Sequence, residues 1–112
     1  MSVKFDFTGL DQPFAADWPV KVNVPQDGGK TVEQEFTARF LLLDKAKIDE
    51  LTADATNPDA YLHAFFVGLP GDQVPEGKTF EEMRALMLAR PNVRMALIKA
   101  FSGFQAGIAV KN

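Results

Sequence analysis

The sequence has no cysteine among its 112 residues and a single histidine, His63. The lack of cysteine excludes disulfide bonds, thiol catalysis and thiolate-rich zinc sites, and it agrees with a reducing cytoplasm. A lone histidine leaves little from which to build a metal site or an acid–base pair. No stretch approaches the ~20 apolar residues that a membrane-spanning helix needs, so we expect no membrane segment.

Basic charge is scarce as well. The chain has twelve lysine and arginine residues and fifteen aspartate and glutamate residues, which gives a formal net charge of −3. Proteins that bind nucleic acids gather basic residues into a stripe that neutralises phosphates, and no such stripe is visible, so we expect no nucleic-acid partner. The first residues alternate in polarity rather than form an apolar run, which predicts no signal peptide and an intracellular protein.

Phenylalanine, in contrast, is abundant. Ten phenylalanines accompany one tyrosine and one tryptophan, and hydrophobic residues make up 46% of the chain against 24% charged residues. These proportions are ordinary for a globular protein of one domain. Because phenylalanine buries a large area and has no polar group, it suits both cores and apolar contact surfaces.

Residues 20–40 show the clearest local pattern, two strands joined at Asp27-Gly28-Gly29. Apolar and polar residues alternate on both sides of the glycines, so we expect one buried and one exposed face. The glycines supply the positive φ angles that tight connections require. The residues of the buried face are Val20, Val22, Val24, Val32, Gln34, Phe36, Ala38 and Phe40. A two-stranded ribbon is marginal alone, so the rest of the chain should cover this face.

Residues 1–19 are interpreted as an N-terminal extension, and residues 20–112 as a single domain. Apolar residues alternate with polar ones over residues 3–8, a pattern that can add a third strand to the hairpin. Glycine, aspartate and proline then interrupt the pattern, which assigns Phe14 and Trp18 to a loop. Whether the extension is ordered stays open.

Four helices are predicted after the hairpin, because helix start signals recur. They are expected at residues 45–55 behind the N-cap Asp44, from the cap Asn57 through Pro58 to Gly68, from the capping box Thr79–Glu82 to about Ala89, and from Pro91 onward. The expected fold class is therefore α+β, an N-terminal antiparallel β-hairpin packed against about four helices.

No motif of catalysis or cofactor binding is recognised. His63 follows Asp59 by one helical turn, which would allow a small enzyme, but a helix residue at the core boundary is the simpler interpretation. Gly28-Gly29-Lys30-Thr31 lacks the upstream glycine of a phosphate loop and leads into a strand, so a hairpin turn accounts for it better. We expect no enzymatic activity, no cofactor and no metal.

The helices carry more apolar residues than one buried face requires. Phe65 and Phe66 are consecutive, so they point to different sides of their helix, and Phe101 with Phe104 raises the same question. One interpretation is a thick core. The other is a groove or a dimer seam, because contiguous exposed apolar area usually marks a partner. The candidates for partner contact are Phe65, Phe66, Met87, Phe101 and Phe104.

Several short motifs follow one another in a telling order. A valine-rich strand, a Pro-x-Asp-Gly-Gly turn and the strand Glu-x-Glu-Phe-Thr-Ala-Arg-Phe come first, followed by Ile48-Asp49-Glu50-Leu51 and an aromatic helix that closes at Val67-Gly68. A glycine- and proline-rich loop then leads to Pro91-Asn92-Val93-Arg94, a long apolar helix and the final Lys111-Asn112. In this order residues 20–112 resemble the tail assembly chaperones of long-tailed bacteriophages and prophages.

The resemblance implies a small non-enzymatic protein of the host bacterial cytoplasm that is absent from the mature virion. Its partners would be the long, largely helical tape measure protein and the major tail protein. Phenylalanine and methionine suit a groove for the apolar stripe of such a helix. Self-association stays open. Such chaperones are often made in two lengths by a ribosomal frameshift, and Lys111-Asn112 is compatible with a slip site at the stop codon.

An alternative from another class is a small phage or prophage regulator or adaptor that binds one protein partner through the same apolar surface. A chaperone gene should lie just before a very long helical reading frame, whereas the gene of a regulator need not. The small-enzyme hypothesis is tested by replacing His63 with alanine, since a binding protein should lose little beyond local stability.

Overall fold

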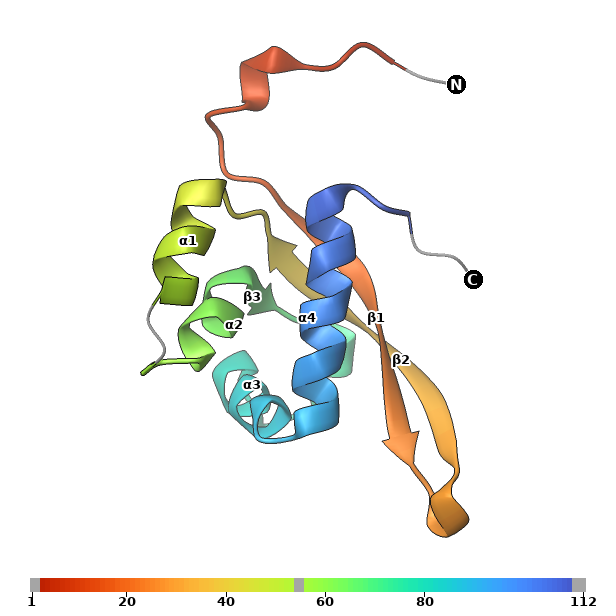
Figure 1. Cartoon of the computed structure of the whole chain (residues 1–112). Helices are drawn as coiled ribbons and strands as arrows, with labels where there is room; N and C mark the ends of the chain where they lie inside the picture. Colours follow the sequence, from red (N-terminus) through yellow and green to blue (C-terminus); the bar gives the residue numbers. More distant parts are fainter. Residues whose placement is uncertain (1–2, 54–55, 110–112) are drawn as a thin grey trace.

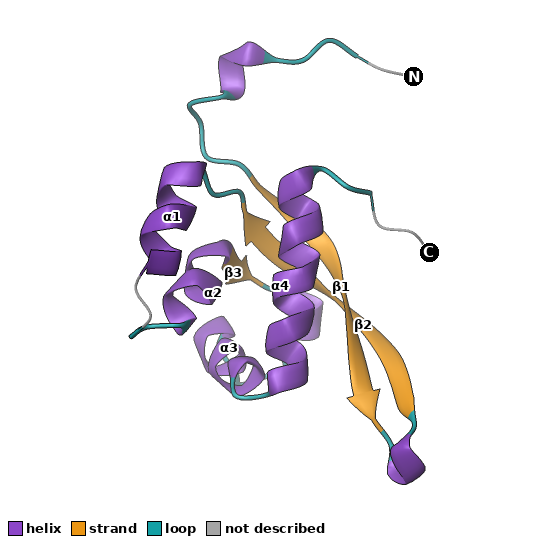
Figure 2. Cartoon of the chain, viewed as in Figure 1, coloured by secondary structure: helices purple, strands orange, loops and turns teal. Residues whose placement is uncertain are grey.

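The computed structural model describes residues 3–53 and 56–109, and within them it shows a three-stranded antiparallel sheet and four α-helices (Figure 1). The strand order is β1-β2-β3, and the helices gather on one side of the hairpin (Figure 2). The elements are β1 (Ala15–Pro25), β2 (Thr31–Leu41), α1 (Lys45–Ala53), α2 (Asp59–Phe65), β3 (Phe66–Gly68), α3 (Phe80–Leu88) and α4 (Pro91–Ala106). The predicted α+β class with an N-terminal hairpin is confirmed. Residues 54–55 of the first predicted helix, and Lys111-Asn112 with the slippage hypothesis, lie outside the described residues.

The hairpin of β1 and β2 has one apolar and one polar face, as the alternation predicts. Val20 and Phe40 are fully buried beneath the helices. On the opposite face Asp17 forms an ion pair with Arg39, at 3.1 Å between Oδ1 and Nη1, and both side chains remain about half exposed. The period of two therefore separates core from solvent along both strands.

The far half of the hairpin projects beyond the helices (Figure 1). There the apolar face loses its cover, so Val24 is only half-buried and Val32 is exposed. Gly28 and Gly29 turn the chain at φ angles of 79° and 78°, a region that side chains with a Cβ rarely adopt. The tip is therefore a glycine turn at the end of an exposed two-stranded ribbon.

Strand β1 begins at Ala15, earlier than the pattern of residues 20–40 predicts. It includes Trp18 and Pro19, so the prediction of a loop around Trp18 is wrong. Proline removes a backbone donor, but an edge strand accepts it where the N–H would point away from the neighbouring strand. Pro19 and Pro25 both occupy such positions, as the hydrogen-bond ladder shows.

The ladder between β1 and β2 joins even-numbered residues. Just beyond the strands, the amide of Gln26 donates to the carbonyl of Lys30 at 2.7 Å, in the same register. Hydrogen-bonded and non-bonded pairs alternate in an antiparallel ladder, so odd-numbered residues direct their N–H and C=O groups outward. The carbonyl of Asn23 is one of these outward groups, and it accepts a hydrogen bond from the side chain of Asn92 in α4.

The third strand is not the one that the N-terminal pattern suggests. Residues 3–8 form no strand and lie exposed, away from the sheet (Figure 1). Instead β3 pairs with the end of β2 at Arg39. The second helix therefore ends at Phe65 and not at Gly68. Phe66 is already extended, with φ −92° and ψ 95°, as its aromatic ring and the following β-branched valine favour.

Beyond β3, a side chain completes the edge of β2. The side-chain oxygen of Gln73 accepts the amide of Thr37 at 2.8 Å, and its nitrogen donates to the carbonyl of Thr37 at 2.6 Å. One carboxamide has one acceptor and one donor group, so it can replace a strand residue. Further along, the outward groups of Thr31, Glu33 and Glu35 have no hydrogen-bond partner within the described part of the chain.

Most helix starts fall where the sequence predicts them. They are Asp44, whose carboxylate accepts the amide of Lys47 at 2.8 Å, the capping box of Thr79 and Glu82 before α3, and Pro91 at the start of α4. Helix α2 differs, because it begins at Asp59 and leaves Pro58 in the cap position predicted for Asn57. The difference is one residue, and helix boundaries shift by this much between criteria.

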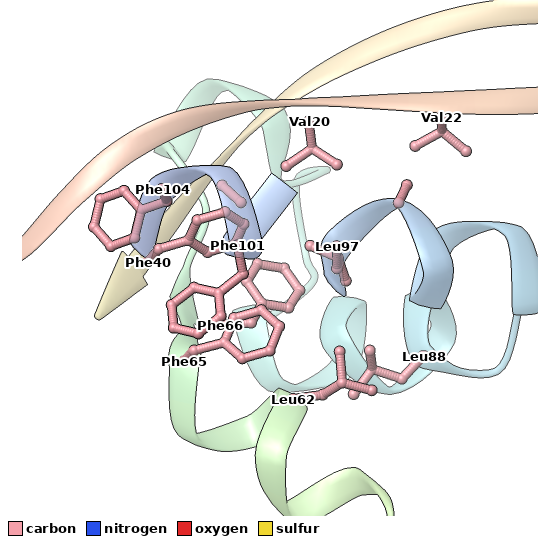
Figure 3. Close-up of a cluster of buried hydrophobic side chains, with 12 residues drawn as sticks. Val20, Val22, Phe40, Leu62, Phe65, Phe66, Leu88, Leu97, Phe101 and Phe104 are labelled. Atoms are coloured by element: carbon pink, nitrogen blue, oxygen red, sulfur yellow. The ribbon is translucent and has the colours of Figure 1, made fainter. Parts of the chain in front are cut away.

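The core lies between the sheet and α2, α3 and α4 (Figure 3). Phe65 and Phe101 stack with ring centroids 4.0 Å apart, and Phe40 meets both edge-on at 5.5 and 5.6 Å. Such aromatic pairs add about 0.5–1.5 kcal/mol each beyond their buried area. The largest fully buried side chains are Val20, Phe40, Leu62, Phe65, Phe66, Leu97 and Phe101. This cluster ties the helices to the hairpin.

Candidate protein-binding groove

The structure brings the predicted contact residues together, but it does so inside the core. Phe65, Phe66 and Phe101 are fully buried, Phe104 is 7% exposed, and Met87 is half-buried against the same cluster. In this conformation the four rings offer a partner almost no surface. The thick-core interpretation accounts for their positions, and a contact role for these five residues stays a prediction.

Asp59 makes its ion pair with Arg94 of α4, one helical turn before His63 in the sequence. Asp59 Oδ1 lies 2.6 Å from Arg94 Nη1 in α4, and the same Nη1 donates to the carbonyl of Leu88 at 3.1 Å. His63 is exposed on α2. In the described part of the chain, no group of three or more histidine, cysteine, aspartate or glutamate side chains could hold a metal ion. Asp59 therefore serves as a tie between α2 and α4.

A groove of about 540 Å³ lies between β1 and α4. Figure 1 shows α4 crossing β1 on the helical side of the sheet. Because it combines a strand with a helix that is distant in sequence, the groove depends on the fold rather than on one segment. Its apolar lining includes Trp18, Met95, Ala96, Ala100, Gly103 and Ile108.

Small residues of α4 keep the groove open. Ala96, Ala100 and Gly103 recur at spacings of four and three, so they share one face of the helix. A Cβ added at Gly103 would meet only the carbonyl of Ile108, at 3.9 Å, within 4 Å. Space therefore remains above this face, and larger side chains would fill it.

Three larger apolar side chains form the walls. Trp18 reaches from β1 and packs edge-on against Phe104, with ring centroids 5.3 Å apart. Met95 on α4 is 72% exposed, and Ile108 beyond the helix is also exposed. An exposed methionine, an exposed isoleucine and a half-buried tryptophan that line one groove make an apolar surface of the kind that binds partners.

The turn that ends α4 sets the position of Ile108. Gly107 adopts the left-handed conformation with φ 71°, and its amide donates to the carbonyl of Phe104 at 3.2 Å. The amide of Ile108 donates to the carbonyl of Gly103 at 2.9 Å. These two bonds form a Schellman motif, which reverses the chain onto the last helical turn. An apolar side chain is thereby brought to the end of the groove.

Polar residues surround the apolar lining. Lys21 and Glu33 lie on the hairpin side and Lys99 on α4. At one end, the side-chain amide of Asn92 donates to the carbonyl of Asn23 at 3.1 Å and joins the helix to the strand. Lys99 is exposed on α4, and its charge favours a partner whose apolar stripe is flanked by acidic residues.

Sequence patterns alone do not reveal this groove. They place Trp18 in a loop, whereas Trp18 lies in β1, and Ile108 beyond α4 is exposed. The stripe of Ala96, Ala100 and Gly103 is the one available signal, because small residues on one helix face predict a close approach. It does not indicate what approaches.

In the described part of the chain, no helix combines the length and apolar character needed to cross a membrane. No protein-family model, curated protein or solved structure matches the chain. A function is therefore inferred from the groove itself and from the order of the sequence motifs.

Proposed function

We propose that this protein is a non-enzymatic tail assembly chaperone of a long-tailed phage or prophage, which binds the tape measure protein and helps to recruit tail tube subunits of the major tail protein. The observation that carries the proposal is the apolar groove between β1 and α4. Its assignment to a phage rests on the succession of motifs in residues 20–112. The protein would act in the host bacterial cytoplasm and be left out of the mature virion.

The groove suits one amphipathic helix of the partner. Because Ala96, Ala100 and Gly103 have short side chains, a second helix can approach α4 to the ordinary axial separation of about 8–10 Å. Met95 has a flexible thioether that adapts to different side chains, and Trp18 offers a large flat apolar surface. A helix laid into an apolar groove is a recurring mode of recognition.

Charge at the rim indicates the character of that helix. Lys99 is exposed and lies on α4 beside the small residues that line the groove. We expect the bound stretch of the tape measure protein to carry acidic residues next to its apolar stripe. Such complementarity sets orientation and association rate more than affinity, so binding should weaken moderately as salt concentration rises.

Capture of the tape measure protein tests the proposal. The full-length protein, carrying a tag, is co-expressed with the tape measure protein and compared with the variant Met95→Asp. We expect the variant to lose at least about tenfold in capture, because a carboxylate would be buried in the apolar contact. The matched control is Leu86→Asp, since Leu86 is 57% exposed on α3 and lies outside the groove.

The expected results of this experiment differ clearly from those that would contradict the proposal. The control should capture the partner as the wild type does, and circular dichroism should show both variants folded. Capture of the major tail protein is measured in the same format. Failure of the wild type to capture the tape measure protein, or equal losses in both variants, would overturn the proposal.

A further inference from the structure

The N-terminal arm, residues 3–14, leads away from the start of β1 (Figure 1). Val3, Phe5 and Phe7 are 87%, 65% and 74% exposed. The rings of Phe5 and Phe7 meet edge-on, with centroids 5.1 Å apart, so both lie on one side of the arm. Clustered exposed apolar residues usually mark a contact surface.

The same molecule has an open sheet edge. Along the projecting half of β2, the outward N–H and C=O groups of Thr31, Glu33 and Glu35 are unpaired within the described residues, and all three side chains are exposed. The rest of this edge is taken by β3 and by the side chain of Gln73. An unpaired edge is a template for a further strand.

The other edge of the hairpin is closed to an added strand. Pro19 and Pro25 lack the outward N–H that a ladder on β1 would need. Between them, the carbonyl of Asn23 is already bonded to Asn92. Strand addition to the hairpin is therefore directed to β2.

We propose that the arm of one copy of this chain adds to β2 of a second copy as an antiparallel strand. The pairs are Val3 with Gln34, Lys4 with Glu33, Phe5 with Val32 and Asp6 with Thr31. In this register the odd-numbered residues of β2 exchange backbone bonds with the arm. The proposal concerns self-association and does not rest on the proposed function.

Side-chain chemistry favours this register. Phe5 falls on the apolar face beside Val32, which the helices leave uncovered. Lys4 falls beside Glu33, whose opposite residue in β1 is the neutral Asn23, whereas Glu35 already faces Lys21. Cross-strand pairs of opposite charge stabilise a sheet, and so do cross-strand pairs of apolar side chains.

The arm is also built to end the strand at Asp6. The carboxylate of Asp6 accepts the amide of Thr8 at 2.9 Å and its hydroxyl at 2.5 Å, and caps the short 3-10 helix Phe7–Gly9. These bonds lower the pKa of Asp6 and keep its carboxylate engaged within the arm. The extended residues 3–6 thus match the short open stretch of β2 in length.

The arm cannot reach this position on its own chain. The arm joins the sheet where the carbonyl of Phe14 accepts the amide of Leu42 at 2.9 Å. From Leu42 to Thr31 the strand spans about 36 Å at 3.3 Å per residue. The chain from Asp6 to Phe14 covers at most about 26 Å at the same rise. An antiparallel arm at this edge must therefore come from a second copy.

Sedimentation equilibrium of the full-length protein over a range of concentrations tests the proposal. We expect the average mass to rise from one chain to two. Lys4→Glu and Glu33→Lys should each raise the dissociation constant about fivefold, and the double variant should restore it. Phe5→Ser should raise it about tenfold. Leu86→Ser, on α3 and outside both the groove and the proposed strand pairing, is the control and should leave association unchanged.

All of these side chains are exposed, so the variants should remain folded, which circular dichroism verifies. A single-chain mass at every concentration would overturn the proposal. So would an association that ignores the arm variants, or a double variant that associates no better than the single ones.

Discussion

Tyr61 is the only tyrosine of the chain, and it lies half-buried against the aromatic core. Its ring meets Phe65 and Phe101 edge-on, at 5.1 and 5.9 Å between centroids. Burial raises the pKa of Tyr61 above the ordinary value of 10.0, because the ionised form is poorly solvated there. The folded protein thus resists ionisation of this hydroxyl more than the unfolded chain does.

Stability should therefore fall at alkaline pH in part through Tyr61. Since the folded pKa lies above the unfolded one, the contribution is fully present below about pH 10 and is lost as pH rises through the folded pKa. Urea unfolding at about pH 9 and about pH 11 should show a smaller loss for Tyr61→Phe than for the wild type. Absorbance at alkaline pH follows the single phenol directly. An equal loss in both proteins would contradict this assignment.

At the scale of elements, the short strand β3 and one loop side chain both form hydrogen bonds with the edge of β2 that lies away from β1. Gln73 is 36 residues away from Thr37 in sequence, yet its carboxamide makes both bonds that a neighbouring strand residue would make. The loop between β3 and α3 is thereby fixed to the sheet. An edge that is bonded by a side chain requires no further strand.

Replacement of Gln73 by alanine should cost about 1–3 kcal/mol in the free energy of unfolding, because two partly buried hydrogen bonds are lost. The amide of Thr37 should also exchange its hydrogen faster. The matched control is Gln34→Ala, since Gln34 is an exposed residue of β2. Urea denaturation and amide exchange measure both effects. The role of Gln73 is wrong if Thr37 exchanges equally slowly in the variant.

Elements with a strong local signal could be predicted from the sequence, and elements set by tertiary contacts could not. The alternation over residues 20–40 and the capping box at Thr79 identify their elements because backbone geometry alone dictates these patterns. Pro19 misleads, because its place in a strand depends on which way its nitrogen faces. Strand β3 is too short for any period to show. The groove could not be predicted from the sequence, because it forms only when α4 and β1 are packed against each other.

At the scale of the whole molecule, the ring cluster makes the hairpin and the helices one cooperative unit. Phe101 of α4 touches Phe40 of β2 and stacks on Phe65 of α2, so three elements meet at one side chain (Figure 3). Burial of these rings explains why the phenylalanine content is high without an exposed aromatic patch on the helices. Loss of this contact should loosen all three elements together.

Phe101→Ala should lower the free energy of unfolding by about 3–5 kcal/mol, the usual cost of a large cavity in a core. A domain of this size has about 5–15 kcal/mol in total, so the variant will be only marginally folded. Ile98→Ala, on the exposed side of the same helix, should cost less than about 1 kcal/mol. Helical circular dichroism and the fluorescence of Trp18 should report one common transition. Separate transitions, or equal costs, would contradict the cooperative role of the cluster.

The prolines of β1 have a consequence for aggregation. A fibril of the cross-β type grows because every strand offers the next one an uninterrupted row of donors and acceptors. In this protein the imino acids at positions 19 and 25 interrupt that row on one side of the sheet. A fibril that grows through the sheets of successive molecules would have to add a strand at the β1 edge, and the two prolines prevent that addition. The long exposed ribbon can thus remain available to a partner without seeding a fibre.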